Sequence, residues 1–426
     1  MTSTLLQPPA SPLLNAPTVR RLANGLTIVA EQMPIEAVSL NLWLNVGSAL
    51  ESDDINGMAH FLEHMIFKGT ARLQSGEFER RVEERGAITN AATSQDYTHY
   101  YITTAPQDFA TLAPLQIDVV TNPSIPDAAF ERERSVVLEE IRRSQDNPRR
   151  RTFQHTAELT FDRLPYRRQV LGPASVIENL TAQQMRDFHR AWYQPQSIIA
   201  VAVGNLPVEE LMAIVESGFS QSSAAPLPPR PLLQPEAAFG EIIRREVTDD
   251  TLQQARLMMT WRVPGLVELE QTYALDILAS ILAQRRTARL VQDLREQRGL
   301  VSGISASNMT YQHQGAFYIS AHLPAENLPA VEAAIVQHLR DIQTNGVTEI
   351  EIDRVRTRVA NQFVFGNETP SDRSGLYGYY QALTGDLAAA FNYSNQIQSL
   401  DAAALQQAAQ RYLSPDAYGV VTICPA

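Results

Sequence analysis

The sequence predicts an α+β fold that is built twice, and three observations lead to this prediction. Strand-like and helix-like segments are mixed in both halves of the 426 residues. The two halves resemble each other at an offset of roughly 220 residues. A stretch rich in serine and proline separates them. We therefore expect two homologous domains, each with a mostly antiparallel sheet that is covered by helices on one face.

The boundary between the halves lies in a stretch whose composition is typical of an extended, semi-stiff connection. Its serines and prolines are Ser220, Ser222, Ser223, Pro226, Pro228, Pro229, Pro231 and Pro235. The whole chain is too long for one compact core. We expect domains at residues 1–218 and 240–426, joined by a linker at 219–239.

The repeat is visible in two pairs of segments. Residues 88–117 resemble residues 304–335 in their order of strand, turn and apolar helix. Residues 192–195, which lead into an apolar strand, resemble residues 411–415, which lead into another. A duplicated domain explains both pairs.

Composition and charge argue against several classes of protein. No apolar run is long enough to span a membrane. The net charge of −12 argues against nucleic acid as a partner and mildly favours basic substrates. The single cysteine, Cys424, forms no internal disulfide, and residues 1–17 lack the pattern of a secretory signal. We therefore expect a cytoplasmic protein.

The most informative motif is His60-Phe61-Leu62-Glu63-His64. On a helix, residues four apart lie on one face, so both imidazoles can reach one divalent ion, with Glu63 beside it. A metal bound there would acidify its water, and the carboxylate would accept the proton. The order is the inverse of His-Glu-x-x-His. The alternative is an ordinary helix whose histidines have this spacing by chance.

A catalytic zinc ion normally has three protein ligands, so a third one is expected elsewhere. The segment 130–141 reads as an amphipathic helix, with Glu133 and Glu140 nearly on one side. A solvated charged face is the alternative, and the spacing alone does not choose between the two glutamates.

The motif and its surroundings resemble the inverzincin peptidases of the pitrilysin, insulin-degrading enzyme and mitochondrial processing peptidase family. In that family a glutamate ligand follows the motif at a characteristic distance along the chain, and Glu140 stands at that distance after His64. The resemblance extends to residues 39–48 and 67–70. It implies zinc as the cofactor, with these site residues: His60, His64 and Glu140 as ligands, Glu63 as general base and Glu133 as an auxiliary residue that orients a ligand.

The resemblance also implies a substrate-binding strand, with Asn90, Ala91 and Ala92 at the contact positions. Small and polar side chains alternate there, which suits an exposed edge that pairs with an extended peptide. An ordinary hairpin strand is the alternative.

In the second half, family members have an arginine and, seven residues later, a tyrosine that hold the substrate across the chamber. This chain has Arg295, but Ser302 stands in place of the tyrosine. The segment 283–287 also lacks the glycine run that is common in relatives. The pair is therefore incomplete in this chain.

The second half has no metal donors at matching positions. The apolar run 275–282 replaces the histidine motif, and Val355 and Gln362 replace the two glutamates. The same architecture therefore forms without donors, which indicates that the donors serve a function. A structural metal would need no general base beside it.

These inferences predict a zinc endopeptidase that cleaves short or unfolded polypeptides. The family works in a chamber of four domains, so a second chain is implied. We expect a related subunit that lacks the zinc motif but has the arginine and the tyrosine, which makes the active species a heterodimer. The alternatives are a self-sufficient homodimer and a non-catalytic core subunit of a larger assembly, although an intact donor set weighs against a scaffold.

Overall fold

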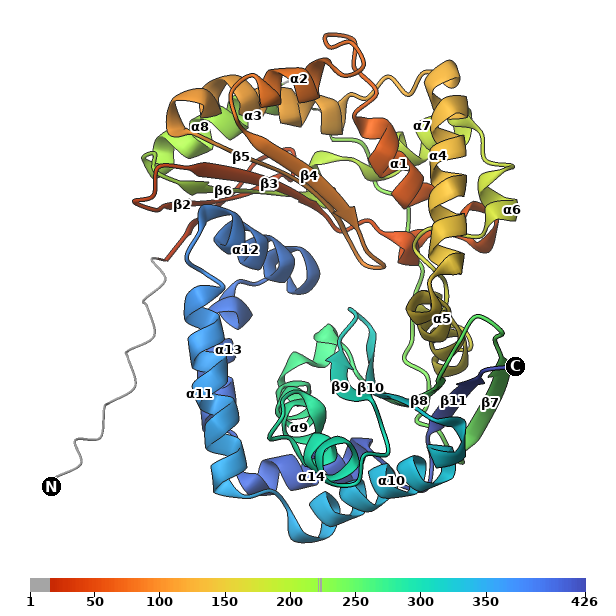
Figure 1. Ribbon diagram of the computed structural model, residues 1–426. Coiled ribbons are helices and arrows are strands. Elements are labelled where there is room, and N and C mark those ends of the chain that lie inside the picture. Colours follow the sequence, from red (N-terminus) through yellow and green to blue (C-terminus); the bar gives the residue numbers. More distant parts are fainter. Residues whose placement is uncertain (1–15, 221, 223) are drawn as a thin grey trace, which may run out of the picture.

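The computed structural model describes residues 16–220, 222 and 224–426, which form two halves around two sheets (Figure 1). The expectation about a secretory signal concerns residues 1–17, and 1–15 of these lie outside the described residues. None of the described helices has both the length and the apolar character that a membrane crossing requires.

The first sheet has six strands and the second has five. The first has the order β1-β2-β6-β3-β5-β4, with bounds Thr18–Arg21, Thr27–Gln32, Ile198–Gly204, Val38–Leu44, Thr98–Thr104 and Ile88–Thr93. The second has the order β7-β11-β8-β10-β9, with bounds Ile243–Thr248, Gly419–Cys424, Ala255–Pro264, Gln314–Leu323 and Gly303–Met309. Only the pairs β2–β6 and β7–β11 are parallel, so the predicted mostly antiparallel sheets are confirmed.

Each half of the chain has its own helices. The first half contains α1 Met58–Ile66, α2 Glu77–Glu83, α3 Pro106–Thr121, α4 Asp127–Asp146, α5 Pro148–Thr160, α6 Ala174–Ile177, α7 Ala182–Trp192 and α8 Val208–Gly218. The second contains α9 Tyr273–Ala283, α10 Leu328–Asn345, α11 Glu349–Phe365, α12 Pro370–Thr384, α13 Ala388–Ser399 and α14 Ala402–Tyr412. In Figure 1, α3 and α8 cover the outer face of the first sheet.

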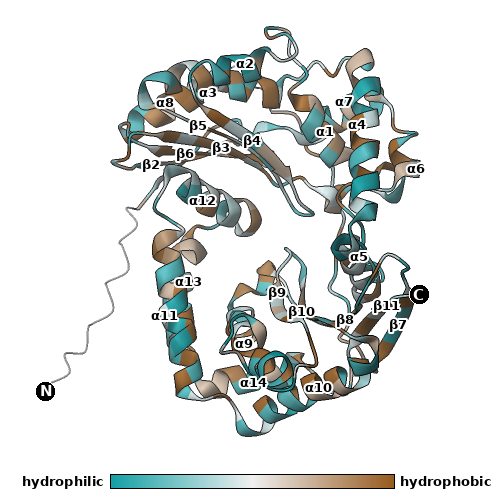
Figure 2. Cartoon of the chain, in the orientation of Figure 1, coloured by the Kyte–Doolittle hydropathy of each residue, from teal (hydrophilic) through white to brown (hydrophobic). Residues whose placement is uncertain are grey.

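The second face of each sheet is covered by a helix from the other half, which the sequence analysis did not predict. Helix α12 packs against β3 and β6, and α5 packs against β8 and β11 (Figure 1). The four strands are equivalent in the two strand orders, so the exchange is reciprocal. In Figure 2 the sheet strands that face these helices are largely hydrophobic. Each exchanged helix therefore completes an apolar core between the halves.

Local sequence signals explain why α5 and α12 run in a different direction from the helices that precede them, α4 and α11. The side chains of Asn147 and Thr369 accept hydrogen bonds from backbone N–H groups in the first turns of α5 and α12, and Pro148 and Pro370 follow as the first helical residues. Proline disfavours a helical conformation in the residue before it. The chain therefore changes direction after α4 and after α11, and the next helix crosses to the other sheet.

Helix α12 is anchored by buried polar contacts. Arg373 forms an ion pair with Glu31 of β2, and the Tyr377 hydroxyl donates to the other oxygen of that carboxylate at 2.7 Å. Gly378 lies against the ring of Trp43, where a Cβ atom would come within 2.1 Å. The close approach of helix and sheet therefore requires glycine at this position.

The segment between α8 and β7 has no helix or strand in its described residues. It is nevertheless fixed to the body of the protein. Glu236 is buried and accepts backbone N–H groups of Asp162, Arg163 and Leu164 at 2.8–2.9 Å. The domain limits at 218 and 240 remain a prediction, because the exchanged helices give the halves a shared core.

Candidate metal centre

Helix α1 is fixed at its N-terminus by a buried carboxylate. Glu51, which is 4% exposed, accepts the backbone N–H groups of Gly57 and Ala59 at 2.8 and 2.7 Å and the Asn56 side chain at 2.9 Å. A negative charge at this end also interacts favourably with the helix dipole. Burial raises the pKa of Glu51 to about 7. The sequence analysis gave this residue no role, although it sets the direction of the helix.

One face of α1 is buried in the core of the first half, and the other faces α4. Phe61 stacks on Phe130 of α4, with ring centroids 4.5 Å apart. This contact holds the two helices side by side, as Figure 1 shows. The residues of α1 that face α4 therefore lie opposite Glu133 and Glu140, which follow Phe130 by about one and three helical turns.

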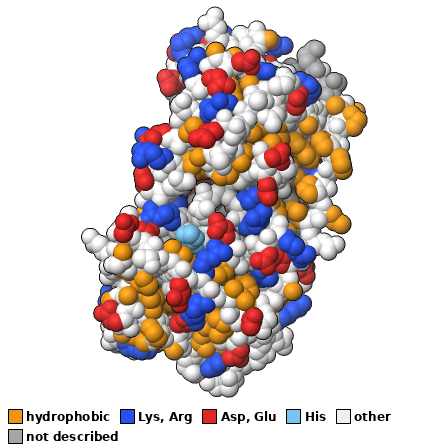
Figure 3. Space-filling view, turned by 90° about the vertical axis from the view of Figure 1, so that its right-hand side faces the viewer, with side chains coloured by type: hydrophobic (Ala, Val, Ile, Leu, Met, Phe, Trp, Pro, Cys, Tyr) orange, Lys and Arg blue, Asp and Glu red, His pale blue; other side chains and the backbone are white. Residues whose placement is uncertain are grey.

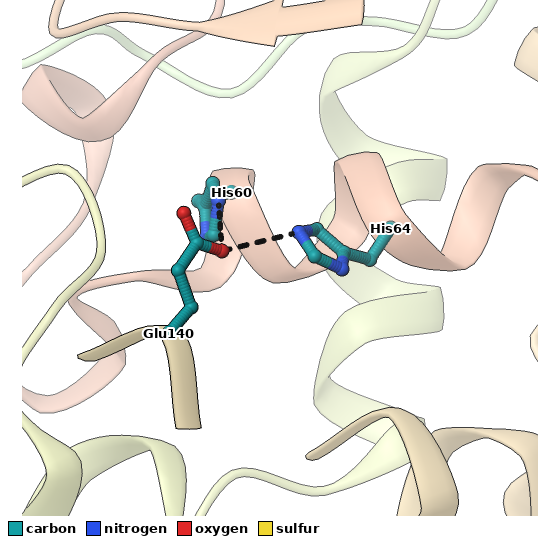
Figure 4. Close-up of side chains that lie close together, drawn as sticks. All are labelled: His60, His64 and Glu140. Carbon is teal, nitrogen blue, oxygen red and sulfur yellow. Dashed lines mark ion pairs between the residues drawn. The ribbon is translucent and has the colours of Figure 1, made fainter. Parts of the chain in front are cut away.

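His60, His64 and Glu140 converge between the two helices (Figure 4). The Glu140 Oε2 atom is 3.5 Å from His60 Nε2 and 3.6 Å from His64 Nε2, and one donor atom from each residue lies within 4.8 Å of the others. Tetrahedral zinc with ligands near 2.0–2.1 Å separates its donors by about 3.3 Å. In the part of the chain that the structure describes, this is the one such cluster. Its atoms can hold a divalent metal ion after a small inward movement.

Glu133 contacts His64 from the side opposite the cluster. Its Oε1 atom is 3.0 Å from His64 Nδ1, and its Oε2 atom is 2.7 Å from the Nζ atom of Lys68. With the proton on Nδ1 donated to Glu133, the lone pair of Nε2 faces the cluster. Lys68 was missed by the sequence analysis. Lys68 lies beyond the end of α1 at Ile66, so helical spacing gave no signal for this contact.

The Glu63 carboxylate lies between α1 and β4. Its Oε2 atom accepts the hydroxyl proton of Thr93, the last residue of β4. Burial raises the pKa of Glu63 from its usual range, while the hydrogen bond from Thr93 acts in the opposite direction. Thr93 was not among the predicted site residues, and it fixes Glu63 beside the edge of the sheet.

The three converging groups differ in their protonation. Burial lowers the pKa of His60 to about 4, so this imidazole is neutral at pH 7 and can donate its lone pair. The nearby His64 lowers the pKa of Glu140 and keeps it ionised. Burial acts to lower the pKa of His64, but Glu140 and Glu133 together raise it. A cation at the cluster therefore competes with the proton that the two carboxylates favour on His64.

The predicted substrate-binding residues lie on β4, at the edge of the first sheet and next to α1 (Figure 1). Asn90 and Ala92 are exposed and Ala91 is half-buried. Strand β4 pairs with β5 on one side, and no described strand pairs with its other side. The backbone there is open to pairing, and the contact role of the three residues stays a prediction.

Arg295 and Ser302 lie in the second half, and among the described residues neither forms a hydrogen bond or an ion pair with the cluster. Arg295, on the short helix Val291–Gln297, forms an ion pair with Glu296 at 2.7 Å. Ser302 donates to Gln254 Oε1 at 2.7 Å. The structure therefore does not bring this pair to the metal donors of its own chain, and its role also stays a prediction.

Sequence models of two domains of one peptidase family match most of the chain. "Insulinase (Peptidase family M16)" matches residues 27–174, and "Peptidase M16 inactive domain" matches residues 179–359. The chain belongs to peptidase family M16. The first match contains His60, His64 and Glu140, and the second contains α9, which has no histidine or glutamate.

Relatives and solved structures agree with this assignment. An uncharacterized zinc protease of Mycobacterium tuberculosis is 28% identical over 414 residues, which are 96% of this chain and 93% of the relative. The zinc protease PqqE of Helicobacter pylori is 26% identical over 402 residues, 92% of this chain and 89% of the relative. The crystal structure of a protease from Helicobacter pylori superposes with a TM-score of 0.90 at 25% identity, covering 96% of this chain and 99% of that one. This M16 chain is thus similar to zinc proteases over nearly its full length.

Proposed function

We propose that this M16 chain is a zinc-dependent endopeptidase that cleaves short or unfolded polypeptides. The observation that supports it most strongly is the convergence of His60 Nε2, His64 Nε2 and Glu140 Oε2, with the Glu63 carboxylate on the same helix. Three protein donors leave one position of a tetrahedral ion open for water, as in catalytic zinc sites, whereas structural sites use four protein ligands.

The residues of the chain have separate roles in this proposal. Zinc held by His60, His64 and Glu140 would supply an acidified water molecule and polarise the substrate carbonyl. Glu63, with its pKa raised by burial, accepts the proton of that water and delivers it to the leaving amine. Glu133 holds His64 in the tautomer whose Nε2 faces the cluster.

The open edge of β4 suits an extended peptide as the substrate. The peptide pairs its backbone with the strand at Asn90–Ala92, where small side chains leave room beside Glu63. Because strands of folded proteins are already paired, we expect broad sequence tolerance among unfolded chains and resistance of stable domains.

A second chain belongs to this proposal. The family resemblance places the arginine and tyrosine of one chain opposite the zinc site of another, and this chain has Ser302 in place of the tyrosine. Loss of one such hydrogen-bond donor costs about a hundred- to thousandfold in turnover. A partner that lacks the zinc motif but has both residues restores the pair. A cytoplasmic location agrees with the single cysteine.

The first experiment measures zinc content and cleavage of an unfolded peptide by the purified chain. We expect Glu63→Gln to retain zinc and to lose about a hundred- to ten-thousandfold in turnover. Glu139→Gln is the matched control, because Glu139 is a partly exposed residue of α4 next to Glu140 and pairs with the surface arginines Arg142 and Arg143. Normal cleavage by the Glu63 variant, or absence of bound zinc in the wild type, would contradict the proposal.

The heterodimer is tested with Ser302→Tyr in the chain alone. A restored phenol should raise turnover roughly tenfold or more, whereas Ser302→Phe, which lacks the hydroxyl, should not. Equal rates for the two variants, or full wild-type turnover that is insensitive to Arg295→Ala, would favour a self-sufficient homodimer.

A further inference from the structure

A cavity of about 300 Å³ lies beside the metal centre, in the angle between α4 and α5. Its walls come from the end of α4, the first turns of α5 and the segment 166–171. Phe153, Ala157 and Leu171 form an apolar part of the lining. The mechanism above makes no use of this cavity.

Two observations place the cavity close to the converging donors. Ser144, one turn after Glu140 on α4, lies in its wall. Arg150, also in its wall, is near enough to the cluster that its charge lowers the pKa of both His60 and Glu140. A peptide whose scissile bond lies at the cluster therefore has a neighbouring side chain within reach of the cavity.

The charge of the cavity wall has one sign. Arg149, Arg150, Arg167 and Arg168 line it, and no aspartate or glutamate does. Arg167 and Arg168 are paired with Asp53 at 3.1 and 2.8 Å. In contrast, the guanidinium groups of Arg149 and Arg150 make no hydrogen bond or ion pair with any described residue. Two cations therefore remain available to a ligand.

The position of Arg149 and Arg150 on α5 strengthens the positive potential at the cavity. Both lie in the first turn of α5, where the helix dipole presents its positive end. In Figure 3 basic side chains lie at mid-height of the face shown, the level at which α5 lies in Figure 1, and acidic side chains are interspersed with them. The whole chain has a net charge of −12, but exposed charges are screened beyond about 8 Å at physiological ionic strength. The local cations therefore decide what the cavity attracts.

We propose that this cavity receives an acidic side chain of the substrate, with Arg149 and Arg150 as specificity-determining residues. The methylene groups of a glutamate pack on Phe153 and Ala157, and its carboxylate meets the two guanidinium groups at the rim. This inference rests on the proposed peptidase function. The net charge of the chain favours basic substrates, whereas this cavity would favour an acidic side chain close to the scissile bond.

The test uses unfolded peptides that differ at one position next to the scissile bond, with glutamate, glutamine, leucine or lysine there. We expect kcat/KM for the glutamate peptide to exceed that for glutamine by about ten- to hundredfold. In Arg149→Gln/Arg150→Gln this ratio should fall to about one. Arg150→Glu should shift the preference to lysine. Because each ratio is taken within one variant, changes at the metal centre cancel.

Arg190→Gln serves as the control, since Arg190 is an exposed arginine on α7 whose loss should leave the ratio unchanged. Cleavage with no preference for glutamate over glutamine, or a preference that survives the double variant, would overturn the inference while leaving the peptidase proposal intact. If the leucine peptide has the highest kcat/KM of the four, the cavity receives apolar side chains and the inference is wrong.

Binding to Glu63→Gln, measured by calorimetry with the same peptides, separates the two proposals. Tighter binding of the glutamate peptide without cleavage by the wild-type chain would support the cavity and contradict the peptidase. Equal binding of all four peptides would contradict the cavity.

Discussion

Helices α1 and α9 occupy equivalent places beside their sheets, and their residues differ at the positions that converge in the candidate metal centre. In α9, Leu275, Leu278 and Ala279 repeat the spacing of His60, Glu63 and His64, and all three are buried in the core of the second half. The fold therefore does not require histidine or glutamate there. The comparison teaches that the first half keeps a polar cluster where its counterpart has an apolar contact, which would be unfavourable without a ligand.

The N-termini of the two helices differ as well. Glu51 accepts two backbone N–H groups at the start of α1, whereas Leu266, at the matching position before α9, is a buried apolar residue and α9 has no side-chain cap. Helix α9 carries no donors that must be positioned, so its N-terminus needs no such hydrogen bonds. The helix with the converging donors is held by polar contacts at its start and by Glu133 and Thr93 along its length.

The largest expected effect comes from removing a donor. His60→Ala should abolish metal binding and reduce peptide cleavage to background, because two ligands remain. The equivalent change in the second half, Leu275→Ala, should leave the zinc content unchanged and lower the free energy of unfolding by about 2–5 kcal/mol. Metal analysis and chemical denaturation of both variants check this. Normal zinc in His60→Ala would refute the ligand assignment.

The two exchanged helices offer the next comparison. Glu31→Ala leaves the charge of Arg373 buried without its partner and should cost about 3–5 kcal/mol in the free energy of unfolding. On the other sheet, Thr160→Val removes the hydroxyl contacts of Thr160 with Thr260 and with the Thr156 carbonyl and should cost about 1–2 kcal/mol. Denaturation curves of the two variants measure both. Equal costs would show that the ion pair does not anchor α12.

The sequence predicts contacts that are local and misses those that arise through tertiary packing. His60 and His64 are four residues apart on one helix, so their shared face is visible without a structure. Glu140 lies on another helix, and only the family resemblance selected it over Glu133. Lys68 and Thr93 reach the site through side-chain contacts that no spacing rule predicts.

The exchange of α5 and α12 was missed for a related reason. An apolar helix face shows that a helix packs against something, but it does not show against which sheet. The two sheets present similar apolar faces, so the choice depends on the turns at Pro148 and Pro370 and on specific pairs such as Arg373 with Glu31.

The buried carboxyl group of Glu51 gives stability a dependence on pH that Leu266, its counterpart before α9, cannot contribute. The pKa of Glu51 is about 7 in the folded protein and 4.5 in a free carboxyl group. Between these values the folded state binds more protons, so this contribution to stability is complete below about pH 4.5 and is lost as the pH rises through 7. Relative to Glu51→Gln, the wild type should lose at most about 3 kcal/mol over this range. A constant difference between the two proteins would contradict this.

The last comparison concerns Glu133, whose counterpart in α11 is Val355. A valine there accepts no hydrogen bond, so the second half shows that the fold forms without this carboxylate. In the first half Glu133 accepts the His64 Nδ1 proton and contacts Lys68. Glu133→Gln keeps the shape but loses the charge that strengthens His64 as a ligand, so zinc affinity should fall about ten- to hundredfold.

The measurement is a zinc titration against a competing chelator, with Glu139→Gln as the control on the exposed side of the same helix. Lys68→Met should have a smaller effect in the same direction, because Glu133 remains but loses the cation that holds its second oxygen. If Glu133→Gln and Glu139→Gln bind zinc equally well, Glu133 does not orient His64. Glu140 would then be the one residue of α4 that contributes to the metal site and has no counterpart in α11.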